Sequence, residues 1–125
     1  MQRSLGQVAL GASDLNRAID CYRTILASDP AAVFPDAGIA FFSLGESRLM
    51  IERDGPPSRI YLVCDRVDSE IGRLVEEGIE LISPPHRIFE HADDRLGPSG
   101  TEEWQAFVKD SEGNLVGLIE FRTGS

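Results

Sequence analysis

The sequence predicts an α+β domain of two tandem βαβββ modules with mixed β-sheets. Three observations carry this prediction. A strand followed by an amphipathic helix begins at Gln7, and the same order begins again at Arg59. Each copy ends in a hairpin and an apolar strand. The Gly- and Pro-rich stretch 54–58 divides the copies, so we expect module one at about 5–53 and module two at about 59–122.

Length and composition fit one domain that covers residues 1–125, with 42% hydrophobic and 26% charged residues. No apolar run approaches the ~20 residues of a membrane helix, and the first residues lack the apolar stretch of a signal peptide. We therefore expect a cytoplasmic protein that does not bind membranes. The net charge of −9 argues against nucleic acid, because phosphate binding needs a basic surface.

The first module begins with a strand over residues 5–12. Ser13 or Asp14 caps the helix that follows, because a short oxygen-bearing side chain accepts an orphan backbone N–H. This helix extends to about Ala27 and has a single apolar face. That face comprises Leu15, Ala18, Ile19, Tyr22, Ile25 and Leu26. A short strand over 32–34 and a hairpin of 38–44 with 48–52 complete the module.

The second module repeats this order with a strand over 60–64. We expect Asp65 to cap its helix and Gly78 to end it. A strand over 81–90 is predicted to break at Pro84-Pro85, and 91–103 is predicted to be a loop. Strands 104–109 and 114–121 pair across the turn Asp110-Ser111-Glu112-Gly113.

Several of these segments resemble the vicinal-oxygen-chelate superfamily, which includes glyoxalases, extradiol dioxygenases and bleomycin resistance proteins. The resemblance covers nearly the whole chain. It is carried by Gln7-Val8-Ala9-Leu10, by Ser13-Asp14-Leu15 with Ala18-Ile19 and Tyr22, and by Asp110-Ser111-Glu112-Gly113-Asn114-Leu115. The stretch 100–107 is similar to a glyoxalase-like subgroup without an assigned reaction. The resemblance implies that the sheets of the paired βαβββ modules curl into a cup with the helices outside. In the enzymes of the superfamily, four side chains inside the cup hold a divalent metal.

The resemblance places the four metal ligands at positions that this chain fills only in part. Gln7 and Glu52 match the first two positions and have oxygen ligands. Arg59 occupies the third and cannot ligate a metal. Gly117 occupies the fourth, unless the last strand is shifted so that Glu120 takes it. Alternation along the strand favours Gly117, because Glu120 would then point to the opposite face.

We therefore predict that no metal cofactor binds, and that Arg59 supplies positive charge where the metal would lie, either pairing with Glu52 or binding the ligand. The competing interpretation leaves Arg59 pointing to solvent. Zn, Ni, Mn or Fe enters only in the alternative function, in which the chain is a metal-dependent lyase, epimerase or dioxygenase. Ligands from a partner chain would be needed to complete that site.

Four further residues are candidates for the site. His86 is a candidate general acid or base, with Glu52 as the other catalytic candidate. Tyr61 shares the face of Arg59, and Trp104 either stacks on a ligand or packs in the core. His91 lies in polar sequence and is given less weight. Cys21 and Cys64 are predicted to be semi-buried free thiols.

Two classes of function remain open on these residues. In the first, the cup binds a small organic molecule for sequestration or sensing, with Gln7, Arg59, Tyr61 and Trp104 as ligand-binding residues. In the second, the chain is an enzyme, metal-dependent or metal-independent, that uses Glu52 or His86. The family resemblance also implies a homodimer.

Overall fold

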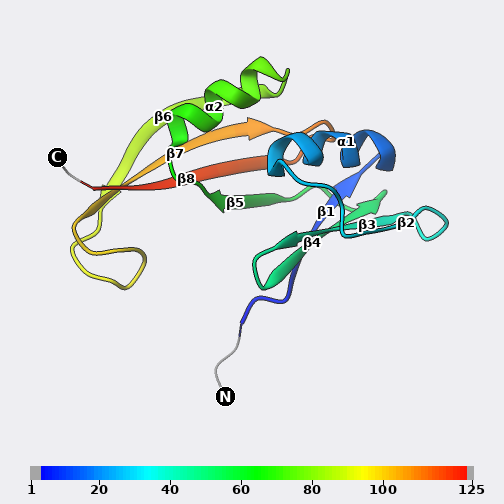
Figure 1. Ribbon diagram of the computed structural model, residues 1–125, viewed down its shortest axis with the longest axis horizontal. Coiled ribbons are helices and arrows are strands. Elements are labelled where there is room, and N and C mark those ends of the chain that lie inside the picture. The colour runs from blue at the N-terminus through cyan, green and yellow to red at the C-terminus, as the bar shows by residue number, and fades with distance from the viewer. Residues whose placement is uncertain (1–3, 124–125) are drawn as a thin grey trace. The chain divides into compact units, whose positions relative to one another are not determined.

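The computed structural model describes residues 4–123, and these form two structural units. The first unit comprises the chain up to Ile60 together with Asp110–Asn114. The second comprises Tyr61–Lys109 and the chain from Leu115. Each unit has one helix and one four-stranded sheet, as the repeat predicted (Figure 1).

The sheet of the first unit has the strand order β1-β4-β3-β2. Its strands are β1 (Gln7–Ala12), β2 (Ala32–Phe34), β3 (Ile39–Leu44) and β4 (Ser47–Arg53). The pair β1–β4 is parallel, and the other two pairs are antiparallel. The sheet is therefore mixed, because β1 reaches its partner through a helical crossover rather than a hairpin.

Helix α1 (Leu15–Leu26) covers one face of this sheet and supplies the core of the unit. Asp14 caps it by accepting a hydrogen bond from Arg17 N at 3.0 Å, as expected. The buried sheet residues face the helix because side chains alternate along each strand. They are Leu10, Ala12, Ala40, Phe42, Leu49 and Ile51.

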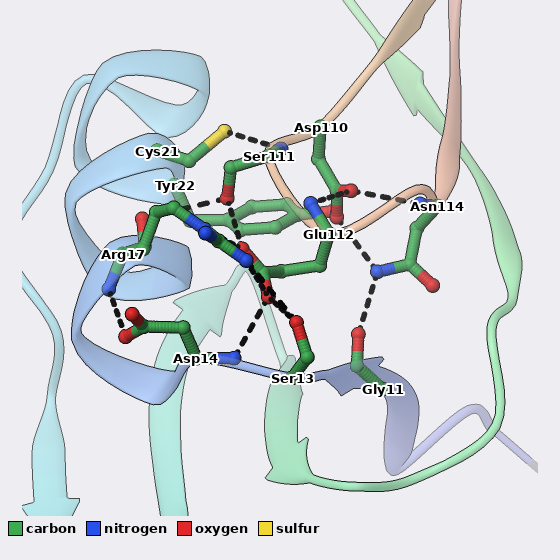
Figure 2. A network of polar contacts seen from close by, with 10 residues as sticks. All are labelled: Gly11, Ser13, Asp14, Arg17, Cys21, Tyr22, Asp110, Ser111, Glu112 and Asn114. Carbon is green, nitrogen blue, oxygen red and sulfur yellow. Dashed lines mark hydrogen bonds and ion pairs between the residues drawn. The ribbon is translucent and has the colours of Figure 1, made fainter.

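The turn Asp110–Asn114 is anchored to the first unit by buried polar contacts (Figure 2). The Tyr22 hydroxyl donates to Asp110 Oδ2 at 2.7 Å, and Asn114 Nδ2 donates to Gly11 O at 2.8 Å. Burial raises the pKa of Tyr22, so its hydroxyl stays protonated as the donor. These bonds explain why the turn needs Asp and Asn: each satisfies buried backbone and side-chain groups at once.

The sheet of the second unit has the order β5-β8-β7-β6. Its strands are β5 (Arg59–Val63), β6 (Glu80–Glu90), β7 (Thr101–Lys109) and β8 (Leu115–Thr123). The predicted break at Pro84-Pro85 is wrong, since β6 continues through both prolines. Shifts of register against β7 between Leu81 and Phe89 accommodate them instead, because a proline has no N–H to donate to the ladder.

Helix α2 (Val67–Glu76) covers one face of this second sheet. The predicted cap at Asp65 is wrong: Arg66 holds the N-cap position and its side chain makes no capping bond. Glu120 of β8 accepts the hydrogen bond of Val67 N instead, at 2.9 Å. A carboxylate from a distant strand therefore caps α2 in place of the predicted Asp65. Its negative charge also interacts favourably with the positive N-terminal end of the helix dipole.

Candidate functional site

The face of the first sheet away from α1 holds Gln7 and Glu52, but it does not bring them together. Gln7 pairs with Arg48 across the β1–β4 ladder, whereas Glu52 pairs with Gly11. The two side chains are thus four residues apart along the strands, or about 13 Å. The groups beside the Gln7 amide are Arg48, whose Nε donates to Oε1 at 2.6 Å, and the Met50 sulfur at 3.8 Å.

Arg59 and Glu52 do not form an ion pair with each other. Both side chains are exposed, and none of the ion pairs among residues 4–123 joins them. The pairing of Arg59 with Glu52 that the sequence raised is therefore not formed. A role for either residue in ligand binding or catalysis stays a prediction.

An aromatic surface covers the second sheet on the face away from α2. The Tyr61 ring lies against the backbone of Gly117, where a Cβ atom would come within 2.7 Å of Tyr61 Cδ2. Phe107 meets the Tyr61 ring edge-on, with centroids 5.7 Å apart. Only glycine at 117 lets the ring approach so closely. Tyr61 remains 46% exposed, which is unusual for a large aromatic side chain packed this way.

His86 and Gln105 extend this surface. They are paired across β6 and β7, so their side chains share one face. His86 Nδ1 lies 2.9 Å from the Pro84 carbonyl, and a carbonyl only accepts, so Nδ1 carries the proton. Nε2 is then an acceptor in the neutral ring. We call Tyr61, Phe107, Gln105, His86 and Ile119 the aromatic face.

Trp104 lies on the other side of the second sheet. It pairs with Glu120, which caps α2, and the Arg122 guanidinium lies 4.0 Å from the centre of its ring. Its indole Nε1 donates to Glu102 at 3.3 Å. The strand directs Trp104 and Tyr61 to opposite faces of the sheet, so they do not contact one ligand there together. A role for Trp104 in ligand binding stays a prediction.

His91 and Glu103 form a buried pair that the sequence did not single out. His91 is 4% exposed and its Nε2 lies 2.8 Å from Glu103 Oε1. Gln105 Nε2 donates to the other carboxylate oxygen at 2.6 Å. Both residues lie in the stretch 91–103 that the sequence predicted to be a loop. Alternation places Glu103, Gln105 and Phe107 on one face of β7, whereas no pattern in the sequence pointed to the burial of His91.

Solved structures share the fold of this chain over almost its whole length. A lactoylglutathione lyase from Agrobacterium tumefaciens matches with a TM-score of 0.71 at 19% identity, over 96% of this chain and 95% of that one. An antibiotic binding protein from Streptomyces sp. CB03234 matches with a TM-score of 0.74 at 20% identity, over 96% and 97%. A glyoxalase/bleomycin resistance protein/dioxygenase from Nocardioides gives 0.69 at 16% identity, over 100% and 87%.

The chain has the vicinal-oxygen-chelate fold. The expected α+β class and its two tandem modules are thus confirmed. No protein-family model and no curated protein matches the sequence. At these identities the likeness establishes the fold and leaves the activity open, since one scaffold hosts many reactions. None of the helices in the described part of the chain is long and apolar enough to cross a membrane.

The residues at the metal-ligand positions of the vicinal-oxygen-chelate enzymes do not fit a metal ion here. The Gln7 amide oxygen is already bonded to the Arg48 cation, and Arg59, at the third position, has no lone pair to ligate a metal. Gly117 is covered by the Tyr61 ring, so no donor occupies its place. Within residues 4–123, no three His, Cys, Asp or Glu side chains gather as metal ligands would.

Glu120 does not replace the missing ligand. Its side chain faces α2, where it accepts from Val67 N and from Arg122 Nε at 3.0 Å. The hydrogen bond from Arg122 lowers the pKa of Glu120, and this keeps the cap ionised. The alternation argument that favoured Gly117 over Glu120 agrees with these directions.

Both cysteines are free, as expected. Burial raises the pKa of Cys21, whose sulfur accepts a hydrogen bond from Ser111 N at 3.3 Å. Burial also raises the pKa of Cys64, to about 11. Because the thiolate is the nucleophilic form, burial makes both thiols less nucleophilic at neutral pH than an ordinary exposed cysteine.

Proposed function

We propose that the chain binds a small organic molecule on the aromatic face of its second sheet, without a metal ion. The observation that carries this proposal is the exposed Tyr61 ring over Gly117. A flat aromatic group there offers area for stacking, whereas a metal-dependent enzyme would need an oxygen or nitrogen ligand at this position.

Polar groups around the Tyr61 ring orient the bound ligand. His86 Nε2 is an acceptor, and the Gln105 carbonyl oxygen is left over after its amide nitrogen binds Glu103. An aromatic surface with a few convergent polar groups is typical of a small-molecule site. The ligand class that fits is a planar molecule with at least one hydrogen-bond donor.

Among the structural neighbours, one is described as an antibiotic binding protein and another as a lactoylglutathione lyase. The first supports small-molecule binding, and neither identifies a reaction of this chain. Binding requires only the surface that this chain retains. A lyase of the metal-dependent kind would require ligands that it lacks.

The experiment is a titration of the ¹⁵N-labelled protein with a panel of planar aromatic compounds, followed by NMR. We expect the amide signals of Tyr61, Phe107 and Gly117 to shift with at least one compound. The substitution Tyr61→Ala should weaken that binding about tenfold, because a stacked aromatic contact is lost. The matched control is Val75→Ala, which trims an exposed residue on α2.

Trp104→Phe provides a second comparison. It should leave the affinity unchanged, since Trp104 lies on the opposite face of the sheet. If Trp104→Phe weakened binding as much as Tyr61→Ala does, the aromatic face would not be the site. A panel that shifts signals only in the first unit would count against the proposal in the same way.

A further inference from the structure

We propose that His91, held by Glu103, accepts a hydrogen bond from the hydroxyl group of a phenol that binds in the pocket lined by residues 89–96. This pocket shares no residue with the aromatic face, and the inference does not depend on the function proposed above. It rests on the setting of His91, the position of its proton and the chemistry of the pocket.

The His91 ring is fixed from several sides. The Phe89 ring lies 4.5 Å and the Phe121 ring 5.5 Å from it, centre to centre. Gly97 packs against it so closely that a Cβ atom there would come within 2.8 Å of Cε1. The loop that carries Gly97 is closed at its base, since His91 N donates to Thr101 O and Gly100 N donates to His91 O. The imidazole is therefore preorganised.

The hydrogen bonds of Glu103 decide where the His91 proton lies. Gln105 Nε2 donates to Oε2 of Glu103, and His91 Nε2 lies 2.8 Å from Oε1. An ionised carboxylate only accepts, so Nε2 of His91 carries the proton. In the neutral ring, Nδ1 then holds a lone pair and is an acceptor.

Nδ1 of His91 is the nitrogen that remains available. No residue of the described chain bonds to it, whereas every fully buried side-chain nitrogen or oxygen within residues 4–123 has a partner. Nδ1 therefore still reaches open space, although the residue as a whole is almost completely buried. A buried, oriented acceptor that is open on one side is suited to accept a hydrogen bond from a bound molecule.

The open space beside His91 is a pocket of about 390 Å³. Phe89 and Leu96 give it apolar walls, and Leu96 is 76% exposed. Asp93 and Arg95 also line it, but they bind each other at 3.0 Å. Its volume suits a molecule of one or two rings.

The chemistry of these walls selects a neutral hydroxyl. A carboxylate would be repelled by the Nδ1 lone pair and by Glu90, which also lines the pocket. An ammonium group would lose its hydration against Phe89 and Leu96, and both carboxylates of the pocket already have cationic partners: Asp93 binds Arg95 at 3.0 Å and Glu90 binds Arg87 at 3.6 Å. A phenol presents an apolar ring to the walls and one strong donor to Nδ1.

The test uses the full-length protein and two probes that differ only in the hydroxyl: 4-methylphenol and 4-methylanisole. Long-range ¹H–¹⁵N spectra of the imidazole rings report tautomer and hydrogen bonding. The chain has two histidines, and exposed His86 lies on the aromatic face, so its signals report binding there separately and the affinities are read from the His91 signals alone. We expect His91 to be the Nε2–H tautomer in the free protein. 4-Methylphenol should shift its Nδ1 signal, and 4-methylanisole should bind at least about fivefold more weakly.

Two substitutions extend the test. His91→Phe keeps an aromatic ring and removes the Nδ1 acceptor, so it should abolish the preference for the phenol over its methyl ether. Leu96→Ala should weaken both probes equally, while Leu5→Ala, at another exposed leucine, should change neither. If His91→Phe does not fold, the tautomer and the two probes on the wild-type protein still decide the question.

Three results would overturn the proposal. They are an Nδ1–H tautomer of His91 in the free protein, equal binding of the two probes, and no response of the His91 signals at millimolar phenol. Failure of the aromatic face to bind a ligand would leave this inference untouched, because Tyr61→Ala does not alter the pocket.

Discussion

The ring of Tyr61 occupies the space that a side chain at Gly117 would need. Because of this packing, the second sheet presents an aromatic ring at position 117 and no side chain that could bind a metal. In the enzymes that the sequence resembles, the last strand carries a metal ligand at the matching position. Here the same position is a glycine, and the Tyr61 ring packs on its backbone.

Gly117→Ala should destabilise the fold by about 1–2 kcal/mol, because the new Cβ would overlap Tyr61 Cδ2 and Phe107 Cε1. Urea unfolding measures this. Gly72→Ala is the matched control: Gly72 lies exposed inside α2 with no neighbour near its Cβ position, so it should stabilise by up to about 1 kcal/mol. In a Tyr61→Ala background the cost of Gly117→Ala should fall, because only the overlap with Phe107 Cε1 remains. An unchanged cost would show that the ring does not fill the space.

Acid should weaken the protein partly through Glu112. The hydrogen bond from Arg17 lowers the pKa of Glu112 to about 2 from its ordinary 4.5. A carboxylate with a lowered folded-state pKa stabilises the fold above its unfolded pKa and loses that contribution as the pH falls through the folded value. The contribution should therefore vanish between about pH 4.5 and pH 2.

Glu112→Gln tests this prediction. It should cost about 1–3 kcal/mol at neutral pH, since bonds to a charged group are lost, and the cost should shrink as the pH falls toward 2. Glu46→Gln, in the exposed turn between β3 and β4, should show no such dependence. Unfolding free energies at several pH values provide the comparison. A cost that stays constant with pH would contradict the assigned role.

Tyr22→Phe should destabilise the protein by about 1–2 kcal/mol. It removes the donor at 2.7 Å from Asp110 and leaves a buried carboxylate oxygen with one partner fewer. The control is Tyr61→Phe at the only other tyrosine, whose hydroxyl makes no hydrogen bond within residues 4–123. Equal effects of the two substitutions on the midpoint of urea unfolding would show that the buried bond contributes nothing.

Divalent metals should not bind stoichiometrically. Equilibrium dialysis against Zn²⁺, Ni²⁺ and Mn²⁺, followed by elemental analysis, should recover well under one ion per chain, because Gln7 is engaged by Arg48 and Gly117 is covered. One tightly bound ion that is lost in Glu52→Gln would contradict the metal-free function. It would also restore the metal-dependent lyase as the better proposal.

Local patterns determined most of the secondary structure. The apolar spacing from Leu15 to Ile25 and the Asp14 cap specify α1 without help from the rest of the chain. Alternation along β8 was enough to place Gly117 and Glu120 on opposite faces. These features depend on the repeat of side-chain directions along one helix or strand, and neighbouring residues in the sequence are enough to reveal that repeat.

The site depended on residues that the sequence keeps far apart, and only the tertiary structure brought them together. Register across β1 and β4 put Arg48 rather than Glu52 beside Gln7. The N-terminus of α2 is capped by Glu120, which is 53 residues from Val67 in the sequence, rather than by the adjacent Asp65. Trp104 and Tyr61 went to opposite faces, and closure of the loop buried His91 beside Glu103. Such pairings follow from packing and strand register, which no local pattern encodes.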